Sequence, residues 1–121
     1  MRILFILLLI VSCSKDVKVT FISKDPAKPI NVIIENEFDI TYSLLTLARQ
    51  NNDVCQMSLE IKNVSKVDKR NSLSIEAHSF AEKKYEAFVV EKKSKPNEVV
   101  NSTVQFNGIN CSDVRKINFY K

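Results

Sequence analysis

The chain has 121 residues and a formal net charge of +4, from 18 lysines and arginines against 14 aspartates and glutamates. It contains one glycine, one histidine and no tryptophan, and its sequence holds neither a glycine-rich phosphate loop nor a dinucleotide-binding fingerprint. The length is enough for one domain with a single core and too short for two.

The first thirteen residues form the clearest signal in the chain. A single charge at Arg2 precedes an apolar run over residues 3–11, and Ser12 and Cys13 follow. The run is well short of the ~20 residues that span a bilayer, so we expect an export signal and not a mature transmembrane helix. Two other interpretations stay open: an ordinary secretory signal in which Cys13 is incidental, and a short buried helix.

The tetrapeptide Ile10-Val11-Ser12-Cys13 resembles the lipobox of bacterial lipoproteins. This resemblance implies a signal peptide over residues 1–12, acylation of Cys13 after cleavage, a lipidated tether over residues 13–16 and a domain over residues 17–121. The lipid on Cys13 is the only bound group expected, since no cofactor is predicted. Because Ser14 follows the cysteine where an aspartate would retain the protein at the inner membrane, we expect an outer-membrane anchor that faces the periplasm.

The remaining two cysteines are expected to pair. With Cys13 assigned to lipid by the resemblance, Cys55 and Cys111 are the only candidates, in a compartment where disulfides persist. The bond would close a loop of more than fifty residues and stabilise the fold by about 4 kcal/mol in the chain-entropy model. The alternatives are a metal pair or a redox site, but there is no Cys-x-x-Cys and only one histidine.

After a short tether, most of the chain alternates as β-strands do, with the clearest case at residues 55–62, where Cys55, Met57, Leu59 and Ile61 share one face. Polar turns separate the segments. The predicted strands cover residues 17–22, 30–34, 55–62, 72–80, 85–90, 99–106 and 114–120.

Residues 36–52 give two signals. Phe38, Ile40 and Tyr42 alternate as in a strand, whereas residues 44–50 have helix propensity and Asn36 with Asp39 matches a capping box. We predict a strand that runs into a helical turn. Six or more short strands with turns about every ten residues indicate an antiparallel β-sandwich.

From Cys55 to Tyr120 the order of features resembles an immunoglobulin-like β-sandwich of the FxLYD type, found in small bacterial envelope proteins. The resemblance rests on an alternating strand that ends at Asn63, on the turn Lys95-Pro96-Asn97-Glu98, and on the segment Cys111-Ser112-Asp113-Val114 with Ile117 after it. It implies a binding or scaffolding role and brings no catalytic residues.

Catalysis is not expected from these residues. His78, the single histidine, lies on the strand face opposite Ile75 and Ala77, so we predict that it is a surface residue. No nucleophile motif surrounds any serine, and the paired acids are scattered among lysines.

Two groups of lysines bracket the predicted strand at residues 85–90. One interpretation is a solvated hairpin whose charges discourage edge-to-edge pairing. The other is contact with an anionic envelope surface, to which Tyr85, Phe88 and Tyr120 could add aromatic contacts. The lysines are Lys83, Lys84, Lys92, Lys93 and Lys95.

Two function classes follow from this sequence. The first is a non-enzymatic accessory lipoprotein that presents a strand edge or loop end to a protein partner in the envelope. The second is a small-ligand-binding or hydrolase-inhibitor lipoprotein, similar to the periplasmic lysozyme inhibitors, although the Ser-Gly-containing loop of those inhibitors has no counterpart here. The membrane is contacted through the lipid anchor, and nucleic acid is not an expected partner.

Overall fold

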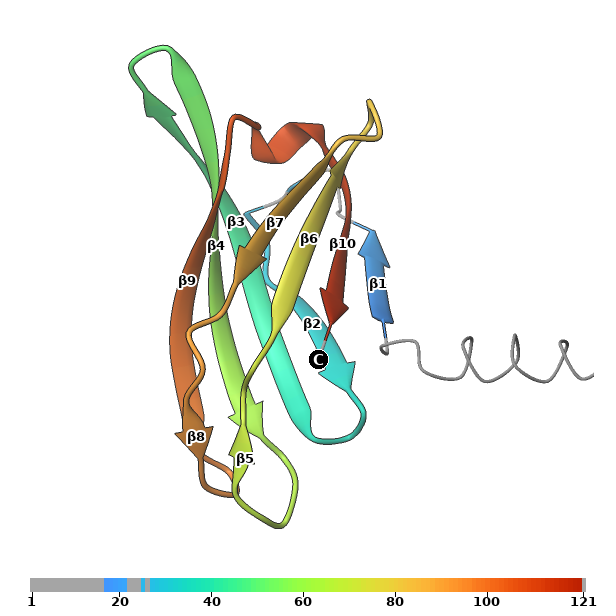
Figure 1. Cartoon of the computed structure of the whole chain (residues 1–121), viewed down its shortest axis with the longest axis vertical. Coiled ribbons are helices and arrows are strands. Elements are labelled where there is room, and N and C mark those ends of the chain that lie inside the picture. The colour runs from blue at the N-terminus through green and yellow to red at the C-terminus, as the bar shows by residue number, and fades with distance from the viewer. Residues whose placement is uncertain (1–16, 22–24, 26, 121) are drawn as a thin grey trace, which may run out of the picture.

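The computed structural model describes residues 17–21, 25 and 27–120, and Figure 1 shows the whole chain. The predicted signal peptide over residues 1–12, Cys13 and the tether over residues 13–16 lie outside the described residues. The elements in chain order are β1 (Val17–Phe21), β2 (Ile30–Ile34), β3 (Phe38–Arg49), β4 (Asn52–Asn63), β5 (Lys69–Arg70), β6 (Ser74–Ser79), β7 (Lys84–Phe88), β8 (Lys93–Ser94), β9 (Val99–Asn107), the 3₁₀ helix η1 (Cys111–Asp113) and β10 (Val114–Tyr120).

Eight of these strands form two antiparallel four-stranded sheets that pack face to face (Figure 1). Sheet A has the strand order β1-β10-β6-β7, and sheet B has the order β2-β3-β4-β9. The short strands β5 and β8 pair with each other separately. The predicted antiparallel β-sandwich is therefore confirmed.

The core lies between the sheets because their inward faces carry the apolar half of each alternating pattern. Ring contact links the two layers directly: Tyr42 of β3 and Phe119 of β10 have centroids 5.4 Å apart. The alternation predicted for residues 55–62 is confirmed. The buried set includes Phe38, Ile40, Leu44, Met57, Leu59, Ile61, Ile75, Ala77 and Ile117.

The helical turn predicted near residues 44–50 is wrong. β3 stays extended to Arg49 and pairs with β4 without interruption, from Phe38 opposite Asn63 to Arg49 opposite Asn52. The local helix propensity is weak compared with twelve cross-strand pairs, a case in which tertiary context overrides propensity. The tip of this β3–β4 hairpin extends past the end of the sandwich (Figure 1).

The capping box at Asn36 is also absent. Glu35 and Asn36 both have positive φ, of 50° and 57°, and the Glu37 N–H donates to the Ile34 carbonyl at 2.9 Å. Two positive-φ residues between paired strands are typical of the type I′ turn, whose twist matches that of a hairpin. Residues 35–37 therefore join β2 to β3 instead of starting a helix.

The predicted disulfide between Cys55 and Cys111 is present, with the Cα atoms 4.9 Å apart. It joins β4 in sheet B to η1, which leads into β10 in sheet A. The Cys111 N–H also donates to Thr46 Oγ1 at 2.8 Å. The bond and this contact fix the crossover between the two sheets.

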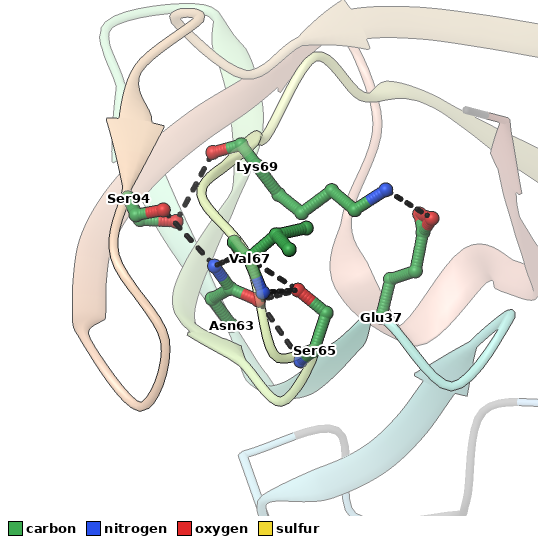
Figure 2. A network of polar contacts seen from close by, with 6 residues as sticks. All are labelled: Glu37, Asn63, Ser65, Val67, Lys69 and Ser94. Carbon is green, nitrogen blue, oxygen red and sulfur yellow. Dashed lines mark hydrogen bonds and ion pairs between the residues drawn. The ribbon is translucent and has the colours of Figure 1, made fainter.

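At the opposite end, buried Asn63 organises two loops (Figure 2). Its Nδ2 donates to the carbonyls of Val67 and Ser94, both at 2.9 Å, and its Oδ1 accepts from the N–H (3.0 Å) and hydroxyl (2.6 Å) of Ser65. The amide thus uses two donors and two acceptor sites. This one side chain therefore connects the end of β4 to the loop at residues 64–68 and to β8.

Candidate functional site

The outer face of sheet A carries a group of partly buried polar side chains. Strand β6 directs Glu76 and His78 to this face, opposite the inward-facing Ile75 and Ala77. Strand β10 is antiparallel to β6 and places Asn118 directly opposite Glu76. With Tyr120 two residues further along β10, these side chains form the outer-face cluster: Glu76, His78, Asn118 and Tyr120.

The cluster is centred on one carboxylate oxygen. Glu76 Oε1 lies 2.6 Å from His78 Nε2 and accepts a hydrogen bond from the Tyr120 hydroxyl at 3.1 Å. Asn118 Nδ2 lies 3.1 Å from the same imidazole nitrogen, and Asn118 Oδ1 has no hydrogen-bond partner among the described residues. His78 of β6 and Tyr120 of β10 thus contact Glu76, and Asn118 of β10 contacts His78.

These contacts constrain the hydrogen-bonding roles of His78 and Asn118. If His78 Nε2 donates to the carboxylate, it cannot also accept from Asn118. Turning the Asn118 amide over would direct its oxygen to Nε2, but it would leave a buried Nδ2 without a partner in place of Oδ1. We therefore assign an Nε2–H donor to His78 and keep the orientation of Asn118.

The surroundings favour the ionised form of Glu76. Burial raises its pKa, but the hydrogen bonds from His78 and Tyr120 and the charges of His78 and Lys84 outweigh burial, so its pKa is below the usual 4.5. The pKa of Tyr120 is raised, chiefly by burial and further by Glu76. At neutral pH the cluster therefore holds a carboxylate and a neutral phenol.

A pocket of about 350 Å³ opens beside this cluster, across β6, β7 and β10. Glu76 of the central strand β6 lines it, with Tyr120 of β10 on one side and Glu86 and Phe88 of β7 on the other. Phe88 is 68% exposed. The pocket thus combines two carboxyl groups with two aromatic rings.

The prediction that His78 is a surface residue is only partly right. Its strand face is the predicted outer one, but the residue is 9% exposed. The reason is its environment: Glu76 and Asn118 contact the imidazole, and Lys116 and Lys84 lie opposite it on the two neighbouring strands.

The five lysines do not form one basic tip. Lys83 and Lys84 lie where β7 begins, whereas Lys92, Lys93 and Lys95 follow the other end of this strand, around β8. Lys93 has an acidic neighbour, Asp68, at 3.8 Å. Contact of these lysines with an anionic surface stays a prediction, and it would involve two separate sites along an edge strand.

Strands β7 and β9 are the edge strands of the two sheets on the side away from β1 and β2. The Gly108 N–H donates to the Asp53 carbonyl, and the Asn63 N–H donates to the Glu98 carbonyl. These two bonds show which phase the β4–β9 ladder has, that is, which alternate residues of β9 form backbone hydrogen bonds with β4. In that phase, even-numbered residues of β9 bond to β4, and the N–H and C=O groups of Asn101, Thr103 and Gln105 point to the open edge. β9 contains no charged residue over its nine positions. Among the described residues no strand pairs with this outer side of β9, and β7 approaches β9 across the sandwich.

Sequence reasoning missed Glu76, Asn118 and the pocket. The alternation of residues 74–79 contains the signal that Glu76 and His78 share a face, but it does not reveal the pairing of β6 with β10. Among residues 17–21, 25 and 27–120, no group of histidine, cysteine and carboxylate side chains is placed to hold a metal, and no helix there is long and apolar enough to cross a membrane.

Comparison with known proteins adds no family to this description. We found no family model that matches this sequence, and no significant match among curated proteins or among solved structures. Assignment of a role therefore rests on the chemistry of the sandwich itself.

Proposed function

We propose that this protein is a lipid-anchored, non-enzymatic envelope module that binds a protein partner by strand addition at the β9 edge. The anchor is the lipid on Cys13, and the expected location is the outer membrane facing the periplasm. The observation that carries the proposal is the open, uncharged edge of β9. An unpaired edge supplies a row of backbone donors and acceptors, to which an extended segment can add as a further strand.

The residues at the β9 edge favour binding of another strand, because they lack the features that normally prevent strand pairing at an exposed edge. Proteins usually protect an exposed edge with lysine, proline or an inward charge. β7 follows this rule, since Lys84 and Glu86, whose backbone groups point to its open edge, are charged. The corresponding residues of β9 are Asn101, Thr103 and Gln105. Uncharged polar side chains impose no repulsion on an incoming strand and permit cross-strand hydrogen bonds.

The test combines crosslinking in native envelopes with variants of one edge position. Thr103→Pro removes an N–H that points to the open edge, so it blocks strand addition while the bonds to β4 remain. Thr103→Ala is the matched control, since it shortens the same side chain and keeps the N–H. Each acylated protein is captured through a C-terminal tag, and the crosslinked proteins are identified by mass spectrometry.

We expect a few stoichiometric envelope proteins with the wild type and with Thr103→Ala. They should disappear with Thr103→Pro and with the unanchored Cys13→Ser protein. Equal recovery with Thr103→Pro would refute the β9 edge as the binding surface. An empty wild-type capture would refute the protein-binding role.

The second candidate, a small-ligand-binding or inhibitor lipoprotein, is favoured by one observation. The pocket beside the outer-face cluster is large enough for a small molecule or a single side chain, and polar groups converge on it. This pocket lies on sheet A, so its occupancy is independent of the β9 edge on sheet B.

A further inference from the structure

The pocket on the outer face of sheet A has the components of a binding site for an organic cation. Its floor is Glu76 of β6, and its walls are Glu86 and Phe88 of β7 and Tyr120 of β10. The Glu76 side chain is 13% exposed, so its carboxylate is held largely out of water. A charge in such a position interacts more strongly with a bound ion than one on an open surface does.

The contacts of Glu76 leave one of its oxygens available. His78 and Tyr120 both contact Oε1. Oε2 makes no hydrogen bond to any described residue, and it is not among the buried atoms that lack a partner. Because Glu76 lines the pocket, Oε2 is an acceptor that a ligand can reach while its neighbour fixes the carboxylate in place.

A second carboxylate lies directly opposite. Glu76 and Glu86 are register partners on β6 and β7. Backbone hydrogen bonds join Val89 N–H to Leu73 and Ser79 N–H to Lys83, so odd-numbered residues of β6 and β7 form the hydrogen-bonded pairs. Glu76 and Glu86 are even-numbered and therefore form a non-hydrogen-bonded pair. Side chains approach most closely in such pairs, and like charges there repel each other. Lys84 offsets part of this repulsion by its charge near Glu76, but it is itself exposed and does not line the pocket.

The aromatic wall indicates the shape of the cation. The Phe88 ring is largely exposed beside Glu86, and Tyr120 closes the other side. A guanidinium group is planar, stacks on aromatic faces and carries five N–H donors, so one face can contact a ring while its edge contacts two carboxylates. An ammonium ion has no flat face and is more strongly hydrated.

We propose that this pocket binds a guanidinium group, in which Glu76 Oε2 and Glu86 accept its N–H donors and Phe88 stacks on its plane. Glu76 and Glu86 are ligand-binding residues, and His78 and Tyr120 are positioning residues that hold the Glu76 carboxylate. The guanidinium can belong to a free arginine derivative or to an arginine side chain of a polypeptide.

The test titrates the acylated full chain in detergent micelles with N-acetyl-arginine amide, followed by two-dimensional NMR. The matched ligand control is N-acetyl-citrulline amide, which has the same shape and a neutral urea group. We expect saturable shifts confined to β6, β7 and β10 with the arginine compound and none with citrulline. Equal shifts with both compounds, shifts elsewhere on the surface, or no shifts at the solubility limit would each overturn the proposal.

Variants connect the binding to the named residues. Glu76→Gln keeps the size of the side chain and removes its charge, and loss of a charged hydrogen bond should weaken binding about tenfold or more. Glu60→Gln is the control, because it makes the same change in net charge at an exposed position on sheet B. Unchanged affinity in Glu76→Gln contradicts the site.

Glu86→Gln and Phe88→Ala keep the test independent of the buried cluster, since both positions are exposed on an edge strand. Each should also weaken binding, and retained affinity in both would exclude the pocket. A glycine pentapeptide with a central arginine separates the two sources: tighter binding than the single amide indicates a polypeptide ligand, and equal binding indicates a free one. Thr103→Pro should leave all these affinities unchanged, so this proposal and the β9 proposal can fail separately.

Discussion

At the residue scale, Glu76 links the outer-face cluster to acid stability. Its pKa is lowered on folding, so its ionised form stabilises the folded state at a pH above the unfolded pKa of 4.5. That contribution is lost as the pH falls through the lower folded pKa. We expect the difference in free energy of unfolding between wild type and Glu76→Gln to be larger at about pH 5 than at lower pH, where Glu76 becomes protonated.

Urea titrations of both proteins at several acidic pH values measure this difference. Glu60→Gln, at an exposed position, provides the control for the loss of one carboxylate. Stability curves for wild type and Glu76→Gln that stay parallel through the acidic range would contradict the pairing of Glu76 with His78 and Tyr120.

Asn63 is the residue on which two loops depend. Asn63→Ala leaves the carbonyls of Val67 and Ser94 without their amide donor and the Ser65 N–H without its acceptor. Ser94 is buried whereas Val67 is exposed, and a buried group that loses its partner costs about 1–3 kcal/mol, so we expect a loss within that range in the free energy of unfolding. Chemical denaturation measures it. Asn101→Ala, on the exposed face of β9, should change stability by less than about 0.5 kcal/mol.

At the element scale, the alternation of backbone hydrogen bonds between β4 and β9 predicts that proline substitutions at two neighbouring positions of β9 differ in their effect on stability. Ser102 bonds to β4, whereas the N–H of Thr103 points to the open edge. Ser102→Pro should lower the free energy of unfolding by about 1–3 kcal/mol because a ladder bond is lost, and Thr103→Pro should cost clearly less. Thermal unfolding of both variants checks this ranking, and the reverse order would show that the register is shifted by one residue.

The elements also show what the sequence can and cannot predict. The strand at residues 55–62 was predictable because its alternation needs no partner to interpret. The full length of β3 was not predictable. The helix propensity around Leu45 and Ala48 can be read from the local sequence, whereas the pairing of β3 with β4 depends on the whole fold. The outer-face cluster was hidden for the same reason: His78 meets Asn118 forty positions away, a contact that depends on which strands are neighbours.

At the scale of the whole molecule, the disulfide is expected to dominate stability. It joins residues 56 positions apart, and closing a loop of this length stabilises the fold by about 4 kcal/mol in the chain-entropy model. For a domain of this size, that corresponds to a decrease in Tm on the order of 20 °C when the bond is removed.

The experiment compares wild type with the Cys55→Ala/Cys111→Ala double variant by calorimetry, with and without a reductant. The double variant should melt lower, and the reductant should lower the Tm of the wild type alone. A reductant effect of similar size in both proteins would show that another process, and not this bond, is responsible.

The position of the two chain ends gives the molecule a mechanical property. Val17 lies opposite Tyr120, so a force that pulls the ends of the described chain apart would separate β1 from β10 one pair at a time, beginning at that pair. The disulfide then limits how far the chain can be extended. The residues between Cys55 and Cys111 lie within a covalent loop, so the pulling force passes through the bond and not through them. β6, β7 and β9 lie inside this loop. Both proposed binding surfaces would thus lie largely on strands that a pull on the ends cannot extend.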